Sequence, residues 1–157
     1  LYPIVSENVR KTSTRFFDKD ELTEKIEIVC DREVIDSIVK AEPIGPLGML
    51  DALLVAPCTG NTLAKIANGI TDSCVWMAVK AQQRNQKPVV MAISTNDGLK
   101  GSAKNIAAVL NSNNIYMVPF GQDDFEKKPN SLVADMDKIP KTLQYALEGK
   151  QIQPILC

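Results

Sequence analysis

The fold of this chain is decided by residues 52–70, which read ALLVAPCTGNTLAKIANGI. Residues 52–56 are continuously apolar and too few for a helix, which is typical of a strand that is buried on both faces. Leu63, Ile66 and Ile70 then recur at helical spacing. The stretch therefore predicts a buried strand, a polar turn and a helix, the unit from which parallel sheets are built.

Three more apolar runs have the same character, at residues 2–5, 89–93 and 115–118, and a weaker candidate strand lies at 35–41. Helical patterns lie between and after these runs, around residues 22–29, after the capping pair Asp72 and Ser73, around 106–110, and from about 137 to 148. Residues 120–130 read as an exposed flap. Alternation of strands and helices predicts a doubly wound parallel sheet in three layers, flavodoxin-like or Rossmann-like, in a single domain over residues 1–157.

Composition excludes several classes of protein. The 157 residues carry 18 Lys and Arg against 19 Asp and Glu, a net charge of −1, so the chain lacks the basic excess of a nucleic-acid-binding domain. Apolar residues make up 45%, as in an ordinary globular protein, and no apolar run reaches the length of a membrane span. Without a signal-peptide pattern as well, we expect a cytoplasmic protein that binds neither nucleic acid nor membrane.

The chain contains no histidine, so it offers no imidazole for a catalytic triad, a general base or a zinc ligand. Its cysteines, Cys30, Cys58, Cys74 and Cys157, form no C-x-x-C pair. This spacing supports neither a zinc site nor a redox dithiol, so we expect reduced thiols and no bound metal.

Polar turns follow the predicted strands. These turns, at residues 6–8, 57–62, 94–98 and 119–124, are rich in hydroxyl and amide groups and carry no run of positive charge. In doubly wound sheets, ligands bind beyond the carboxyl ends of the strands, next to helix N-termini. The same residue types also serve as ordinary helix caps and turns. Four such turns at one sheet edge favour a pocket for a nucleotide or a flavin.

Residues 56–70 resemble the flavin-binding signature of the homo-oligomeric flavin-containing decarboxylase superfamily. Further stretches that resemble this superfamily are residues 2–9, 41–46, 92–99, 118–124 and 127–136. The resemblance implies a flavodoxin-like fold, a bound FMN and a homo-oligomer. It also implies that a first strand-helix unit, which members carry ahead of the position of Leu1, is missing from this chain.

The resemblance also implies which residues contact the cofactor. The positions that match the family's flavin contacts are Ser6, Thr59, Gly60, Asn61, Thr62, Ser94, Thr95 and Asn96. The decarboxylases of this superfamily use a histidine, and its absence from this sequence argues against decarboxylation.

Within the superfamily, the chain is similar to the branch that makes pyridine-2,6-dicarboxylate from a dihydro precursor during sporulation. That likeness implies an oxidoreductase subunit with a partner that binds NAD(P). The alternatives are an FMN-dependent decarboxylase and a flavin-free structural subunit. No catalytic residue is assigned; Arg10, Arg15 and Lys104 are candidates to bind the substrate carboxylates, and Asp97 and Asp123 to accept a proton.

Overall fold

Strand β2 (Val89–Thr95) is the centre of a five-stranded sheet in the computed structural model, which describes residues 1–15 and 17–157. It pairs in parallel with β1 (Leu53–Thr59) on one side. On its other side it pairs in parallel with β3 (Ile115–Met117) and, beyond that, antiparallel with β5 (Leu132–Ala134). Strand β4 (Phe120–Gly121) pairs with β5. Residues of β2 from Val89 to Ile93 are completely buried, as the continuous apolar run predicts.

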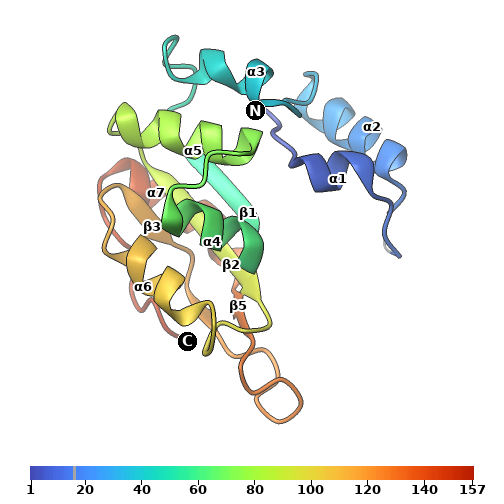
Figure 1. Ribbon diagram of the computed structural model, residues 1–157. Coiled ribbons are helices and arrows are strands. Elements are labelled where there is room, and N and C mark those ends of the chain that lie inside the picture. The colour runs from blue at the N-terminus through green and yellow to red at the C-terminus, as the bar shows by residue number, and fades with distance from the viewer. Residues whose placement is uncertain (16) are drawn as a thin grey trace.

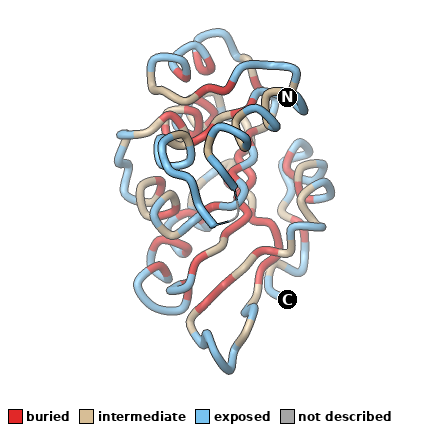
Figure 2. The backbone as a smooth tube through the Cα atoms, turned by 90° about the vertical axis from the view of Figure 1, so that its right-hand side faces the viewer, coloured by how far each residue is buried: buried red, intermediate tan, exposed pale blue. Residues whose placement is uncertain are grey.

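Helices cover both faces of this sheet. Helices α4 (Gly60–Asn68), α5 (Cys74–Arg84) and α6 (Ala103–Leu110) lie in front of it in Figure 1, and α7 (Ile139–Leu147) lies behind it. Figure 2 shows the buried strands running between these two layers. The predicted three-layer α/β fold is therefore confirmed. Of the helices within the described residues, none is long and apolar enough to cross a membrane.

The N-terminal part differs from the prediction. It forms α1 (Glu7–Lys11), α2 (Lys19–Cys30), α3 (Ile38–Ala41) and the short 3-10 helix η1 (Glu42–Ile44). The run at residues 2–5 does not join the sheet, because its pairing is a single parallel bridge between Ile4 and Ile35. Most of the run at 35–41 is helical, since the Ser37 side chain accepts a hydrogen bond from the Lys40 backbone and so starts α3.

The C-terminal part contains elements that the sequence pattern does not reveal. Strands β4 and β5 form an antiparallel hairpin. Its loop contains residues 122–130 of the predicted exposed flap, but the first two flap residues form β4 and Phe120 is buried. A 3-10 helix, η2 (Met136–Lys138), leads into α7. The chain end then runs along the sheet: the Gln151 amide donates to the Met117 carbonyl and accepts from the Met117 N–H, both at 2.7 Å. A side chain thus completes the backbone pairing of β3.

Candidate functional site

Two of the predicted turns meet at the carboxyl edge of the sheet. Parallel pairing sets Thr59, the last residue of β1, opposite Ser94 of β2. A Cβ built on Gly60 would lie only 2.6 Å from Oγ1 of Thr95, so the two turns are in contact. The structure therefore brings residues 59–62 and 94–96 together, as their positions after neighbouring parallel strands predict. Their role in holding a cofactor stays a prediction.

The first turn opens helix α4. The Thr59 hydroxyl accepts a hydrogen bond from the backbone N–H of Thr62 at 3.5 Å, which makes Thr59 the N-cap. Asn61 is exposed, and Gly60 and Thr62 are half-buried. The N–H groups of a first helical turn have no acceptor within the helix, and the helix dipole adds partial positive charge there. This turn can therefore bind an anionic or strongly hydrogen-bonding group.

The second turn divides its side chains between the interior and the surface. Ser94 is half-buried and Asn96 is exposed, whereas Thr95 is buried. The Thr95 hydroxyl donates to Oδ1 of Asp97 at 2.5 Å. Because this hydroxyl already has a partner inside the protein, the structure places Ser94 and Asn96 at the surface, but not Thr95.

Ser6 lies on a cavity that it shares with the first turn. This cavity, of about 400 Å³, lies between β1 and the N-terminal segment that carries α1 and α2. Ser6, Thr59 and Thr62 provide its hydroxyl groups, and apolar residues of the N-terminal segment, β1, α2 and α5 line the rest. Residues 94–96 lie outside this lining. A mostly apolar cavity of this size with a few hydroxyl groups fits a flat heteroaromatic ring with a polar or anionic end. The residues therefore fit a flavin.

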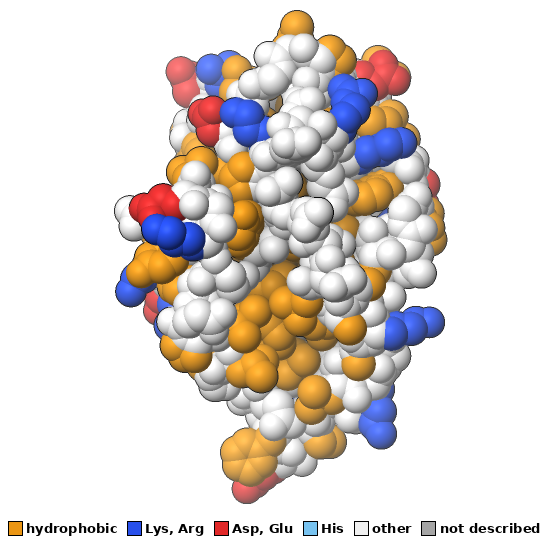
Figure 3. Space-filling model, turned by 90° about the vertical axis from the view of Figure 1, so that its left-hand side faces the viewer, with side chains coloured by type: hydrophobic (Ala, Val, Ile, Leu, Met, Phe, Trp, Pro, Cys, Tyr) orange, Lys and Arg blue, Asp and Glu red, His pale blue; other side chains and the backbone are white. Residues whose placement is uncertain are grey.

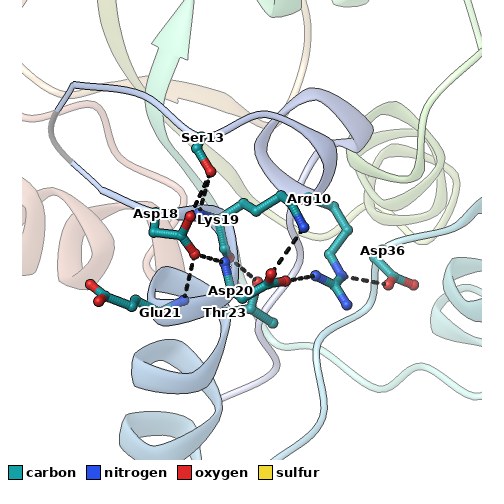
Figure 4. A network of polar contacts seen from close by, with 8 residues as sticks. All are labelled: Arg10, Ser13, Asp18, Lys19, Asp20, Glu21, Thr23 and Asp36. Atoms are coloured by element: carbon teal, nitrogen blue, oxygen red, sulfur yellow. Dashed lines mark hydrogen bonds and ion pairs between the residues drawn. The ribbon is translucent and has the colours of Figure 1, made fainter.

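Two of the residues proposed to bind substrate carboxylates, Arg10 and Lys104, lie on different helices, α1 and α6. Figure 4 shows that Arg10 lies between Asp20 and Asp36, with N–O distances of 3.2 and 3.5 Å, so its charge joins α1 to α2 and to the segment before α3. Lys40 also contacts Asp36, at 3.0 Å, and this hydrogen bond is the main reason that the pKa of Asp36 is lowered. Lys104 is exposed in the first turn of α6.

Both proposed proton acceptors, Asp97 and Asp123, have lowered pKa values. Hydrogen bonds from Thr95 and Ser102 lower the pKa of Asp97. Hydrogen bonds from Ser131 and Lys128 lower the pKa of Asp123. A carboxylate with a lowered pKa accepts a proton less readily at neutral pH. The geometry gives both groups a structural role.

Two of the cysteines, Cys58 and Cys74, are buried. Burial raises the pKa of Cys58, at the end of β1, to about 12. The Cys74 thiol donates to the Val5 carbonyl at 3.0 Å and so attaches the N-terminal segment to α5. Among the described residues, no group of three or more His, Cys, Asp or Glu side chains is placed to hold a metal.

Sequence reasoning missed the partnership of Asp97 with Ser102. The Ser102 hydroxyl donates to Oδ1 of Asp97 at 2.8 Å, the same oxygen that binds Thr95. An acidic residue between two hydroxyl residues in one turn was the available signal, but such a pattern also occurs in ordinary caps.

Comparison with known proteins gives a consistent result. The model of the family described as Flavoprotein matches residues 5–142. The B subunit of dipicolinate synthase from Bacillus subtilis is 52% identical over 154 residues, which cover 98% of this chain and 77% of that protein. The crystal structure of the B subunit of dipicolinate synthase from Bacillus halodurans superposes with a TM-score of 0.91 at 47% identity, over 99% of this chain and 80% of that one.

More distant structures share the fold. The FMN-dependent cysteine decarboxylase SpaF superposes with a TM-score of 0.58 at 21% identity, over 80% of this chain and 70% of that one. At this identity, the likeness shows the arrangement of helices and strands and nothing finer.

Proposed function

This chain belongs to the Flavoprotein family, and from that membership we propose that it acts as the B subunit of a dipicolinate synthase. The observation that carries the proposal is the likeness to the Bacillus subtilis protein along almost the whole chain. We further propose that the enzyme works in the cytoplasm during sporulation.

The proposed reaction oxidises dihydrodipicolinate to dipicolinate, pyridine-2,6-dicarboxylate. The ring loses a hydride and a proton and becomes aromatic. The proton passes to a base or to water, and the hydride passes to a nicotinamide or flavin acceptor. The partner in this proposal is the A subunit of dipicolinate synthase, which would bind NAD(P). Both Bacillus relatives are named as B subunits, and these names support the existence of a second kind of chain in the enzyme.

FMN is the cofactor that we propose for this chain, where it would supply a hydride acceptor. The residues that would hold it are Ser6, Thr59, Gly60, Asn61, Thr62, Ser94 and Asn96. Thr95 belongs to the same turn, but its buried hydroxyl is bound to Asp97. The start of α4 would bind a polar end of the molecule through backbone N–H groups. The apolar wall of the cavity would orient the ring and exclude water from it.

A homo-oligomer is part of the same proposal. Figure 3 shows a broad hydrophobic area on the face that it draws, with charged side chains mostly near the margins of the view. Large exposed apolar side chains include Leu110, Leu147 and Leu156, at 45%, 58% and 65% exposure. Apolar surface of this kind favours contact between subunits.

A flavin-free structural subunit is the second candidate function. It is supported by the lowered pKa values of Asp97 and Asp123, the two carboxylates that we considered as proton acceptors. An FMN-dependent decarboxylase is the least favoured, because the 157 residues contain no histidine.

One experiment separates these functions. The chain is purified with and without its partner, and dipicolinate formation and the visible absorption spectrum are recorded on the same samples. We expect activity only with both subunits present, together with a flavin spectrum. Fully active but colourless material would refute the flavin part and leave intact the assignment of the chain to dipicolinate synthase. No activity with the partner would refute that assignment.

A matched pair of variants locates the cofactor. Asn61→Ala removes an exposed amide at the start of α4 and is expected to weaken FMN binding about fivefold or more. Asn113→Ala removes an exposed amide just before β3, at the other edge of the sheet, and is expected to leave FMN binding unchanged.

A further inference from the structure

Thr95, Asp97 and Ser102 form a compact polar group, the Asp97 cluster, beside the proposed cofactor turns. Thr95 and Ser102 are only 8% and 4% exposed. Their hydroxyls donate to one and the same oxygen, Oδ1 of Asp97, at 2.5 and 2.8 Å. Hydrogen bonds to an ionised acceptor are shorter and stronger than those between neutral groups. The cluster therefore ties the end of β2 to the start of α6.

The Ser102 hydroxyl is directed at Asp97 and not at the backbone of α6. It occupies the N-cap position of α6, yet its side chain makes no hydrogen bond to the helix backbone. Serine at this position normally accepts from a backbone N–H of the first turn. The backbone of Ser102 is helical here and not extended, and its hydroxyl donates to Asp97.

The first turn rests directly on this cluster. A Cβ on Gly60 would lie 2.6 Å from Oγ1 of Thr95, 3.3 Å from Oγ of Ser102 and 3.4 Å from Oδ1 of Asp97. The backbone at the start of α4 can come this close only because residue 60 is glycine. The position of the Asp97 cluster thus fixes the distance between the two turns.

The loop after β2 also packs against the hairpin of β4 and β5. A Cβ on Gly98 would lie 2.7 Å from the Leu132 side chain, and the Leu99 N–H donates to the Asn130 carbonyl at 3.0 Å. The loop after β2 is therefore packed between α4 and the hairpin of β4 and β5. Asp97 is its central anchor, and its Oδ1 makes both side-chain contacts.

We propose that Asp97 is a positioning residue for the flavin site: it acts through the hydroxyls of Thr95 and Ser102 and holds Ser94 and Asn96 beside the start of α4. This inference rests on the proposed function. It also reassigns Thr95, whose hydroxyl would act on the cofactor through loop geometry and not by direct contact. Asp97 itself touches no cofactor in this arrangement and is not a catalytic residue.

The test compares variants of the full chain, purified with its partner. FMN affinity is measured by quenching of flavin fluorescence, and amide hydrogen exchange of residues 94–102 is measured without flavin. Asp97→Ala is expected to weaken FMN binding at least about tenfold and to speed exchange in this loop. Asp97→Asn keeps an oxygen at the Oδ1 position, so it is expected to restore most of the affinity and protection. Asp51→Ala, at an exposed carboxylate before β1, is the matched control and is expected to change neither.

Two further variants, Ser102→Ala and its combination with Asp97→Ala, test whether Asp97 acts on FMN binding through Ser102. Ser102→Ala alone is expected to weaken FMN binding less than Asp97→Ala does. The double variant is expected to bind FMN about as well as Asp97→Ala does, because Ser102→Ala removes a hydrogen bond that Asp97→Ala has already removed. Additive losses would overturn the positioning role. FMN binding that is unchanged in Asp97→Ala would also overturn the positioning role and leave the proposed function intact. The same holds if Asp97→Asn weakens FMN binding as much as Asp97→Ala does. A wild-type complex that binds no FMN would overturn the flavin part of the proposed function and this inference with it. If Asp97→Ala does not fold, Ser102→Ala and Asp97→Asn decide between these outcomes.

Discussion

Gly60 is the residue with the least room at the proposed site. Replacement by alanine would put a methyl group against Oγ1 of Thr95, an atom that is fixed by its bond to Asp97. We predict that Gly60→Ala lowers the free energy of unfolding by about 1–3 kcal/mol, because a buried hydroxyl pair must move. Urea unfolding measures the change.

Gly45→Ala is the control for this prediction. Its new methyl group would meet mainly the guanidinium end of Arg84, which can swing away. We expect a loss below about 1 kcal/mol. Equal losses at positions 45 and 60 would show that the Asp97 cluster is not rigid.

The cysteines differ in reactivity because their surroundings differ. Burial raises the pKa of Cys58 to about 12, so almost none of it is thiolate at neutral pH, whereas Cys157 is exposed. With iodoacetamide at about pH 8, we predict that Cys157 is modified first and Cys58 last. Mass spectrometry of the labelled peptides gives the order. Early labelling of Cys58 would contradict the buried position of the β1 end.

At the scale of elements, the side chain of Gln151 makes the backbone hydrogen bonds that a neighbouring strand would make with β3. Its amide makes both backbone contacts of Met117 in β3, each at 2.7 Å. We predict that Gln151→Ala lowers the free energy of unfolding by about 1–3 kcal/mol, because two backbone groups lose their partners. Gln144→Ala, an exposed change on α7, is expected to alter stability by less than about 0.5 kcal/mol. Comparable effects of the two changes in thermal or urea unfolding would refute this role of Gln151.

Helices α1 and α2 are joined by the ion pairs of Arg10 (Figure 4). We predict that Arg10→Met changes global stability by less than about 1 kcal/mol, since exposed ion pairs contribute little, but speeds amide exchange in α1 and α2. Lys80→Met, an exposed change on α5, is the control and is expected to leave that exchange rate unchanged.

The effect of Arg10→Met on amide exchange is expected to decrease as the pH falls. Hydrogen bonds from Lys19 and then Arg10 lower the pKa of Asp20, and mainly one from Lys40 lowers the pKa of Asp36. The ion pairs of these carboxylates therefore stabilise the folded protein above the ordinary carboxylate pKa and lose that effect as the pH falls through the lowered values. The difference in exchange between wild type and Arg10→Met is therefore expected to vanish in acid. A difference that persists after these carboxylates are protonated would contradict the assignment.

These elements also show what the sequence could predict. Strands β1 and β2 and helices α4 to α7 follow from continuous burial and from helical spacing, both of which the residues display directly. The bridge at Ile4 could not be distinguished from a strand, because four apolar residues carry no information about their partner. Strand β3 was predicted from the apolar run at residues 115–118, whereas β4, with two residues, is too short to give a pattern.

The candidate site was predictable in part for a similar reason. Turns after neighbouring parallel strands must meet at one edge, so the meeting of residues 59–62 with 94–96 follows from topology. The direction in which each side chain points does not follow from the topology. Thr95 turns inward and Asn96 outward because a carboxylate two residues beyond Thr95 captures its hydroxyl, a choice among several equally good local hydrogen bonds.

At the scale of the whole molecule, the proposed flavin site joins turns that lie far apart in the sequence at the carboxyl edge of the sheet. The site draws on the start of α1, the start of α4 and the end of β2. One bound ligand is therefore expected to protect all three segments at once.

Amide hydrogen exchange of the complete two-subunit complex, with and without FMN, tests this site most directly. We predict that FMN slows exchange at Ser6, at residues 59–62 and at residues 94–96, and leaves residues 113–116, at the opposite edge of the sheet, unchanged. Protection of only one of these segments, or protection confined to residues outside them, would contradict a single shared site.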